Sequence, residues 1–281
     1  MYIAEDTIEK FIKEDVPYFD LTTYLLEIAE KRGRMEFICR EEAVVCGTEE
    51  VLRVLGKLGC APVNYLASGT RIHPQSTILE AEGRAEDLHK GWKVSMNILE
   101  YASGIATRTN QLLVKARKIN PKIEVLTTRK IFPGTKEIAI KAVLAGGGLP
   151  HRLGLSETVL VFKQHLNLIG GKEGLLDRLS EIKSRCCEKK VIVEIEDPHD
   201  ALALSRAGVD GMQFDKISPS ELKKTVDLIR AENREIILLA AGGINENNVD
   251  QYAQTGVNGL VTSWVYFGKP TDIGTKIEPL V

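Results

Sequence analysis

Basic side chains gather in one part of the sequence, between Thr127 and His165. Six lysines and arginines fall in this stretch, and its only acidic residues are Glu137 and Glu157. The planar guanidinium of arginine pairs with carboxylate or phosphate through two hydrogen bonds, and lysine supplies a compact positive charge. The stretch therefore predicts a site for an anionic small molecule, although any one of these cations, taken singly, is more typical of a solvated loop. The candidate residues are Arg129, Lys130, His151, Arg152 and Lys163.

Two carboxylates, Glu194 and Asp215, end two successive apolar runs further along the chain. Oxygen ligands of this kind hold Mg2+, usually together with water and the phosphates of a substrate. The alternative is that both residues form structural salt bridges. Glu196 has the same strand alternation as Glu194, so it either faces the same site or begins the next helix.

A glycine pair, Gly242 and Gly243, follows a third apolar run, before a helix expected to open near Asn245. Free backbone N–H groups at the start of a helix favour an anion, so this turn predicts a phosphate site. A tight turn between strand and helix explains the two glycines equally well.

Six short apolar runs after Pro121 are expected to position these residues, and helical patterns separate the runs. Runs without polar alternation are typical of parallel strands that are covered on both faces. Six such units are fewer than the eight of a complete barrel, so they predict an incomplete (β/α) TIM-like barrel. The carboxyl ends of its strands share one rim, where the polar residues would meet. The runs are 123–128, 158–162, 190–196, 211–215, 235–240 and 259–263.

The chain before these runs has an α/β pattern of a different kind. Strands are expected at 34–47, 63–68 and 76–85, with a helix over 48–59. A long helical stretch, 91–119, is expected to bridge two domains.

Composition excludes several classes of protein. The 281 residues have a formal net charge of −2, without the global field that attracts nucleic acid or an anionic membrane. Five cysteines without C-x-x-C spacing indicate neither a disulfide framework nor a zinc ribbon. The charged first residues are unlike a signal peptide, and no apolar run approaches the ~20 residues of a membrane span. We therefore expect a cytoplasmic protein that binds small anions, with neither nucleic acid nor membrane as a partner.

Seven motifs, from EDVPYFDLTT near the start of the chain to AAGGINENNVDQYAQTGV near its end, are spread over nearly the whole sequence. Their order resembles that of the quinolinate phosphoribosyltransferase family. FPGTK, GGGLPHR and VFKQH are most similar to the ModD branch, whose pyrophosphorylases are associated with molybdenum-transport genes. The motifs are EDVPYFDLTT, NILEYASGIAT, TTRKIFPGTK, AGGGLPHRLGLSETVLVFKQH, VEIED, MQFDKISP and AAGGINENNVDQYAQTGV.

The resemblance implies an N-terminal open-faced α/β sandwich (1–105), an incomplete α/β barrel (106–267) and a C-terminal segment that returns to the first domain (268–281). It also implies a homodimer with shared active sites, with a larger oligomer left open. The activity it implies is that of a nicotinate-nucleotide diphosphorylase-like pentosyltransferase of NAD biosynthesis. Such an enzyme joins quinolinate to phosphoribosyl pyrophosphate with Mg2+ and releases pyrophosphate and CO2.

The resemblance also assigns roles by position. Arg129, His151, Arg152 and Lys163 would hold the substrate carboxylates. Lys130 would lie beside substrate and phosphates, and would act in catalysis together with Glu194 and Asp215. These two carboxylates would hold the metal and the ribose. The phosphate-binding positions would be Gly242, Gly243 and Ser263.

The chain departs from the family pattern at three places. Lys93 stands where the family usually has an arginine that reaches over from the partner subunit, and lysine is not equivalent at a bidentate site. Leu239-Ala240-Ala241 replaces Glu-Ser-Ser, and Ser263 replaces a glycine. The acceptor therefore stays open between quinolinate and a related anion. Two other classes also stay open: a barrel lyase with Lys163 or Lys130 as a Schiff base, and a binding or regulatory protein for an oxyanion or a molybdenum species.

Overall fold

The structure is a computed structural model that describes residues 1–280. The chain divides into two compact units, each assembled from separate segments. The domain limits expected near residues 105 and 267 remain a prediction, and Val281, where the expected C-terminal segment ends, lies outside the described residues. Unit 1 consists of Met1–Asn110, Ile131–Gly147 and the end of the chain from Tyr266, and unit 2 of Gln111–Lys130 and Gly148–Val265.

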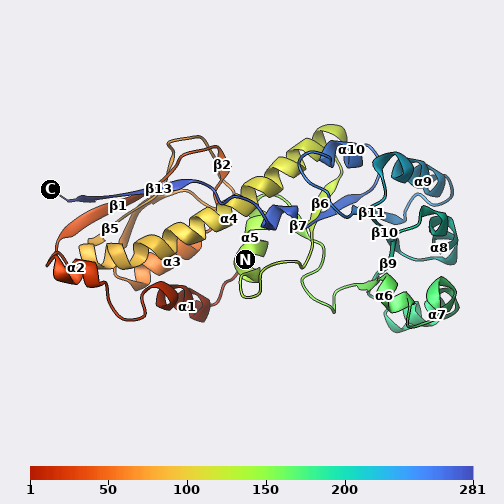
Figure 1. The fold of residues 1–281 in the computed structure, drawn as a ribbon, viewed down its shortest axis with the longest axis horizontal. Helices are drawn as coiled ribbons and strands as arrows, with labels where there is room; N and C mark the ends of the chain where they lie inside the picture. The colour runs from red at the N-terminus through yellow and green to blue at the C-terminus, as the bar shows by residue number, and fades with distance from the viewer. Residues whose placement is uncertain (281) are drawn as a thin grey trace. The chain divides into compact units, whose positions relative to one another are not determined.

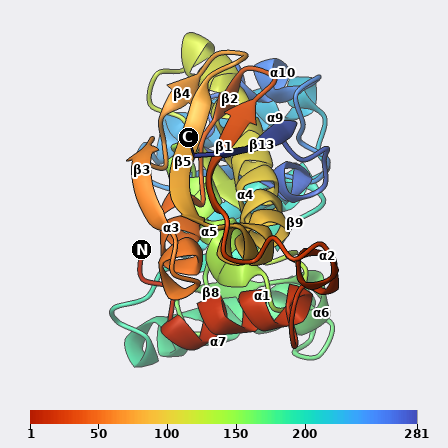
Figure 2. The same ribbon diagram turned by 90° about the vertical axis from the view of Figure 1, so that its left-hand side faces the viewer.

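An antiparallel sheet of four strands, in the order β13-β1-β5-β3, forms the centre of unit 1 (Figure 2). Burial alternates residue by residue along β1, because helices cover one face of the sheet and leave the other open. This is the open-faced α/β sandwich that the family resemblance implied. The strands are β1 (Arg32–Cys39), β3 (Ala61–Tyr65), β5 (Thr77–Arg84) and β13 (Ile273–Pro279), with β2 (Ala43–Val44) and β4 (Arg71–Ile72) paired separately.

Helices α3 and α4 lie along the sheet of unit 1 (Figure 1). Thr275 of β13 donates a hydrogen bond to the sulfur of Met96 on α4, at 3.6 Å. Gly146, the first of three consecutive glycines (146–148), packs against α4 so closely that a Cβ there would lie 2.7 Å from the Cβ of Thr109. The helices are α1 (Glu5–Asp15), α2 (Leu21–Leu25), α3 (Thr48–Lys57), α4 (Ala85–Ile119, which continues into unit 2) and α5 (Lys136–Ala145).

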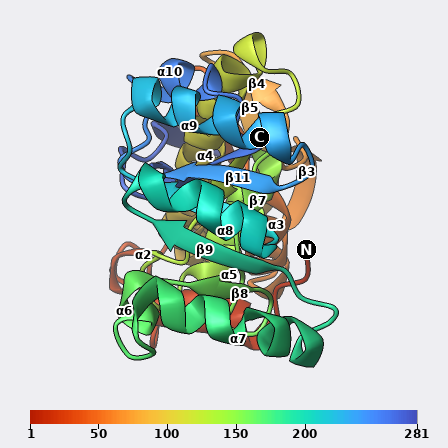
Figure 3. The same ribbon diagram turned by 90° about the vertical axis from the view of Figure 1, so that its right-hand side faces the viewer.

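Unit 2 contains a parallel sheet of seven strands in the order β7-β6-β12-β11-β10-β9-β8, so β7 and β8 are its two edges. Helices α7, α8 and α9 lie on its outer side (Figure 3). The strands are β6 (Glu124–Thr127), β7 (Leu149–Pro150), β8 (Val159–Val161), β9 (Val191–Ile195), β10 (Gly211–Asp215), β11 (Ile237–Ala241) and β12 (Gly259–Thr262). The helices are α6 (Lys163–Leu166), α7 (Gly171–Arg185), α8 (Ala201–Ala207), α9 (Pro219–Glu232) and α10 (Val249–Ala253), with 3-10 turns at Pro198–Asp200 and Trp264–Tyr266.

The incomplete barrel expected from the six apolar runs is confirmed, with β7 as a seventh strand that the sequence did not predict. Side chains on the inner side of this sheet form an apolar floor that includes Leu160, Leu239 and Val261. Across residues 1–280, no helix is both long and apolar enough to span a lipid bilayer.

Candidate active site

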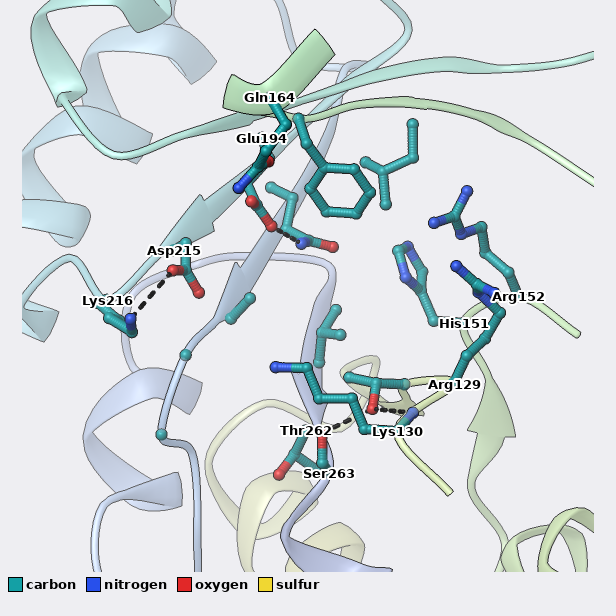
Figure 4. A pocket seen from close by; sticks show the side chains of 18 residues that line it. Arg129, Lys130, His151, Arg152, Gln164, Glu194, Asp215, Lys216, Thr262 and Ser263 are labelled. Carbon is teal, nitrogen blue, oxygen red and sulfur yellow. Dashed lines mark hydrogen bonds and ion pairs between the residues drawn. The ribbon is translucent and has the colours of Figure 1, made fainter. Parts of the chain in front are cut away.

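A cavity of about 510 Å³ opens at the carboxyl ends of the parallel strands of unit 2. Its lining comes from the ends of β6 to β12 and the residues that follow them, and the apolar floor contributes Leu160, Ala241 and Val261. Parallel strands place their carboxyl ends together, which is why residues far apart in the sequence meet here. Figure 4 shows the polar side chains around this cavity.

One wall of the cavity is cationic. Arg129 and Lys130 follow β6, and His151 and Arg152 follow β7, where the His151 N–H donates to the Thr127 carbonyl at 2.9 Å. Arg152 is only 8% exposed, and its guanidinium carbon lies 5.6 Å from the centroid of the Phe162 ring. Among the described residues, no acidic side chain forms an ion pair with the cations of this wall, Arg129, Lys130 and Arg152. A buried cation without a partner is costly, so this wall favours an anionic ligand.

His151 belongs to this wall but is not one of its charges. Burial lowers the pKa of the imidazole from 6.5 to about 4, and the positive charge of Arg152 acts in the same direction. Its Nε2 is buried and has no hydrogen-bond partner in the described structure. At neutral pH His151 therefore offers a ring nitrogen for a hydrogen bond rather than a positive charge.

The opposite wall is acidic. Glu194 of β9 accepts a hydrogen bond from Nε2 of Gln213 at 2.6 Å, and Asp215 ends the neighbouring strand β10. Burial raises the pKa of Glu194, and the negative charge of Asp215 raises it further. Figure 4 places Glu194 and Asp215 across the cavity from Arg129 and Arg152. A molecule with anionic groups at one end and hydroxyl groups at the other suits this division of charge.

The acidic wall holds two of the oxygen ligands that a magnesium ion prefers. Within residues 1–280, no three histidine, cysteine, aspartate or glutamate side chains come together as a ligand set. Mg2+ is commonly bound by one or two carboxylates, with water and substrate phosphates as the remaining ligands. Glu194 and Asp215 supply two carboxylates of that kind.

The glycine turn after β11 lies beside Asp215. Gly242 has φ +87°, and a Cβ there would lie 2.5 Å from Cγ of Lys216 and 2.6 Å from Oδ1 of Asp215, so only glycine fits. Gly243 has φ +76°, and a Cβ there would meet no atom within 4 Å. The helix expected to open near Asn245 was placed wrongly, because α10 begins only at Val249 and is one turn long. A helix dipole therefore gives no support to a phosphate site here. Only the free backbone groups of the turn support one.

Ser263, Lys163 and Lys93, three residues expected to bind substrate or phosphate, lie in different surroundings. Ser263 lines the cavity and shares a hydrogen bond of 2.6 Å with the hydroxyl of Thr128. Lys163 does not line it: its ammonium pairs with Glu196 at 2.7 Å, and that carboxylate raises the pKa of the lysine. Lys93 belongs to α4 in unit 1, where its ammonium lies 4.5 Å from the centroid of the Trp92 ring. Substrate binding by Lys163 and Lys93 remains a prediction.

Several residues of the cavity were not among the candidates from the sequence, and Phe162, Gln213 and Lys216 are three of them. Gln213 is 5% exposed, and its Oε1 has no partner in the described structure. The signal for it was present, because Gln213 and Asp215 are two positions apart on one strand and therefore share a face. Phe162 and Lys216 each come directly after a strand, where alternation no longer determines the direction of a side chain.

Comparisons with known proteins agree on one family. The family model described as "Quinolinate phosphoribosyl transferase, N-terminal domain" matches residues 20–103, and the model for the C-terminal domain matches residues 105–275. The chain is 34% identical over 281 residues to "Putative pyrophosphorylase ModD" of Pasteurella multocida, covering 100% of both chains. It is 31% identical to a "Probable nicotinate-nucleotide pyrophosphorylase", described as carboxylating, of Methanothermobacter thermautotrophicus, covering 98% of this chain and 99% of that one. The crystal structure of nicotinate-nucleotide pyrophosphorylase from Ehrlichia chaffeensis matches with a TM-score of 0.88 and 26% identity, covering 99% of this chain and 100% of that chain.

Proposed function

Because the chain belongs to the quinolinate phosphoribosyl transferase family, we propose that it transfers the phosphoribosyl group of phosphoribosyl pyrophosphate to an anionic acceptor and releases pyrophosphate. The acceptor is quinolinate or a related ring carboxylate. The ModD relatives at 31–36% identity support a ModD-like role for the protein.

The single observation that best supports this proposal is the division of charge within one cavity. Arg129 and Arg152 lie on one wall without acidic partners, and Glu194 and Asp215 lie on the other. A reaction between an anionic acceptor and a phosphorylated sugar needs both kinds of wall within one site. The apolar floor between them, which includes Leu160 and Val261, suits the flat face of an aromatic ring.

On the cationic wall, the two arginines would hold the carboxylates of the acceptor. Arg152 is suited to this because its stem is buried and its guanidinium lies against Phe162, so its position is largely fixed before binding. His151 would donate or accept a hydrogen bond through Nε2, the buried ring nitrogen that lacks a partner. Lys130 would reach the phosphates of the donor substrate.

On the acidic wall, Glu194 and Asp215 would bind the ribose and stabilise the positive charge that develops on it. The transition state of such a transfer resembles an oxocarbenium ion, as in glycoside cleavage, and fixed negative charges stabilise it. Gln213 holds Glu194 in place through its 2.6 Å hydrogen bond. The same two carboxylates would hold Mg2+, which, when bound with the substrate, neutralises part of the negative charge of the leaving pyrophosphate.

The proposed reaction balances without an external oxidant or reductant. The lone pair of the acceptor nitrogen forms a bond to C1 of the ribose while the bond from C1 to the pyrophosphate oxygen breaks. The electrons of that broken bond leave with pyrophosphate. If the acceptor is quinolinate, loss of its 2-carboxylate as CO2 leaves an electron pair on the ring carbon, which then takes up a proton.

The Schiff-base alternative is less well supported for Lys163 than for Lys130, because a lysine nucleophile must lose its proton. Glu196 pairs with Lys163 and raises the pKa of its amine, which opposes this step. A binding protein without turnover would use the same cationic wall but would leave the pair of carboxylates without a role.

A screen of ring carboxylates with phosphoribosyl pyrophosphate and Mg2+, read by release of pyrophosphate, tests the proposal. We expect at least one acceptor to give release that depends on protein, acceptor and donor together. Tight ligand binding with no release from any acceptor would favour a binding protein. Trapping of a carbonyl substrate by borohydride would favour the lyase.

A further inference from the structure

We propose that Lys216 binds the 5-phosphate of the donor substrate, over the turn that Gly242 and Gly243 form. This inference rests on the proposed function, because it assigns one phosphate of the phosphoribosyl donor to one lysine.

Lys216 has a backbone conformation that lysine rarely adopts. Its φ is +58°, in the left-handed region, and only two other non-glycine residues of the described chain, Glu27 and Gln75, have positive φ. Of the three, Lys216 alone lines the cavity. Such a conformation costs about 1 kcal/mol or more for a residue with a Cβ, whereas glycine adopts it freely. A lysine at this position therefore indicates a role for its side chain.

Two contacts fix the start of this side chain. The Lys216 N–H donates to the carbonyl of Ala241 at 2.9 Å, which continues the pairing of β10 with β11 past the end of β10. A Cβ on Gly242 would lie 2.5 Å from Cγ of Lys216, so the lysine stem rests directly against the glycine turn. The ammonium therefore extends from a stem that lies against this turn.

The ammonium has no strong partner in the described structure. Its nearest carboxylate is that of Asp215, at 3.9 Å, and the side chain is 79% exposed (Figure 4). An exposed pair at this distance contributes at most about 1 kcal/mol, so the ammonium can turn toward a ligand at little cost.

The turn beside Lys216 offers hydrogen-bond donors for the same anion. The carbonyl of Gly243 is already used, since it accepts from Nδ2 of Asn245 at 2.9 Å and from Nδ2 of Asn248 at 3.0 Å. The N–H of Gly243 has no partner in the described part of the chain, and a Cβ built on this residue would meet no atom within 4 Å. A phosphate placed there would accept from this N–H and pair with Lys216. Asp215, next to Lys216 in sequence, would then face the ribose that bears the phosphate.

The test measures binding of ribose 5-phosphate by calorimetry, so it does not depend on turnover. We expect Lys216→Gly to weaken binding at least ~10-fold, while its Tm is no lower than that of the wild type because glycine tolerates positive φ. Lys216→Arg keeps the charge and should stay within about threefold of the wild type. Gln75→Gly is the matched control: it replaces another residue with positive φ, at +70°, outside the cavity, and should leave binding unchanged.

Three results would overturn the assignment. Wild-type affinity of Lys216→Gly for ribose 5-phosphate would mean that Lys216 does not bind the phosphate. Equal losses of affinity in Lys216→Arg and Lys216→Gly would mean that Lys216 does not act through its positive charge. A loss of affinity for inorganic pyrophosphate, with ribose 5-phosphate unaffected, would assign Lys216 to the leaving group instead.

The same measurements separate this inference from the proposed function. If ribose 5-phosphate binding depends on Lys216 but no acceptor gives pyrophosphate release, the phosphate site stands and the transferase activity fails. If release occurs and Lys216→Gly binds ribose 5-phosphate normally, only the assignment of Lys216 fails.

Discussion

The guanidinium carbon of Arg152 lies 5.6 Å from the centroid of the Phe162 ring, and this contact joins the two edges of an open sheet. Arg152 follows β7 and Phe162 follows β8, the first and last strands of the seven. A cation above an aromatic face is worth about 0.5–2 kcal/mol, depending on how far it is desolvated. The contact positions the arginine without neutralising it, so its charge remains available to a ligand.

Arg152→Ala should weaken binding of the acceptor by at least ~10-fold and binding of phosphoribosyl pyrophosphate by less. The reason is that its expected partner is a carboxylate of the acceptor, held by paired hydrogen bonds. Calorimetry with each substrate separately gives both affinities. The opposite order of losses would assign Arg152 to the phosphates.

Glu194→Gln and Asp215→Asn should each lower turnover by at least ~100-fold, which corresponds to ~2.7 kcal/mol of transition-state stabilisation. Each change removes a negative charge that faces the developing positive charge of the ribose. Glu232→Gln is a suitable control, because that carboxylate pairs with Arg206 outside the cavity. Full activity in both cavity variants, or in an excess of chelator, would mean that Glu194 and Asp215 do not hold a metal ion and the ribose.

The strand ends could be predicted from the sequence because their pattern depends on burial alone. Apolar runs without alternation identified β6, β8, β9, β10, β11 and β12, and parallel strands necessarily bring their carboxyl ends to one rim. Arg129, Glu194 and Asp215 were therefore expected in one place, and they line one cavity. Strand β7 was missed because two residues are too short to form a run.

The direction of side chains beyond a strand end could not be predicted in this way. Strand β8 ends at Val161 and helix α6 begins at Lys163, so strand alternation no longer applies to the lysine, which pairs with Glu196 outside the cavity. The protonation state of His151 could not be predicted from the sequence either. Its pKa depends on burial and on the distance to Arg152, which the order of residues does not contain.

The stability of the protein should fall as the pH falls from 6.5 to about 4, in part because of His151. In this window the unfolded chain binds a proton at the imidazole and the folded chain does not, since burial lowers the pKa from 6.5 to about 4. Proton binding by the unfolded state favours unfolding, and this group contributes a loss of about 3 kcal/mol across the window.

Urea unfolding of the wild type and His151→Gln at a series of pH values measures this contribution. The variant should lose less stability between pH 6.5 and 4, and the difference between the two proteins should be constant above pH 7. Parallel curves through the whole range would mean that His151 titrates normally in the folded protein.

Alanine substitutions at the two glycines of the β11 turn should have unequal effects. Both residues have positive φ, so each change costs about 1 kcal/mol of backbone strain. Gly242→Ala adds a clash with Lys216 and Asp215, whereas a Cβ on Gly243 meets nothing within 4 Å. We expect Gly242→Ala to lower the free energy of unfolding by at least ~2 kcal/mol more than Gly243→Ala. Equal losses would show that the turn relaxes and does not hold Asp215 in place.

Lys93 should complete the active site of a second subunit. It lies on α4 in unit 1, whereas the cations and carboxylates of the cavity all belong to unit 2. Its ammonium lies over the Trp92 ring and forms no ion pair with another described residue, so it remains available to an anion. A single ammonium in place of a guanidinium keeps the charge but loses the paired hydrogen bonds, which should relax selectivity for a dicarboxylate without abolishing transfer chemistry.

Mixing Lys93→Ala with Asp215→Asn, both of which we expect to be inactive alone, tests this arrangement directly. If each site combines Lys93 of one subunit with Asp215 of the other, a mixed dimer contains one site with both native residues and one site with neither. Mixed dimers should then recover about half the turnover of the wild type. Subunit exchange is verified with two different affinity tags, and wild-type subunits carrying the same tags are the control for full activity. Exchanged dimers that stay inactive would mean that Lys93 acts within its own chain, or not at the site at all.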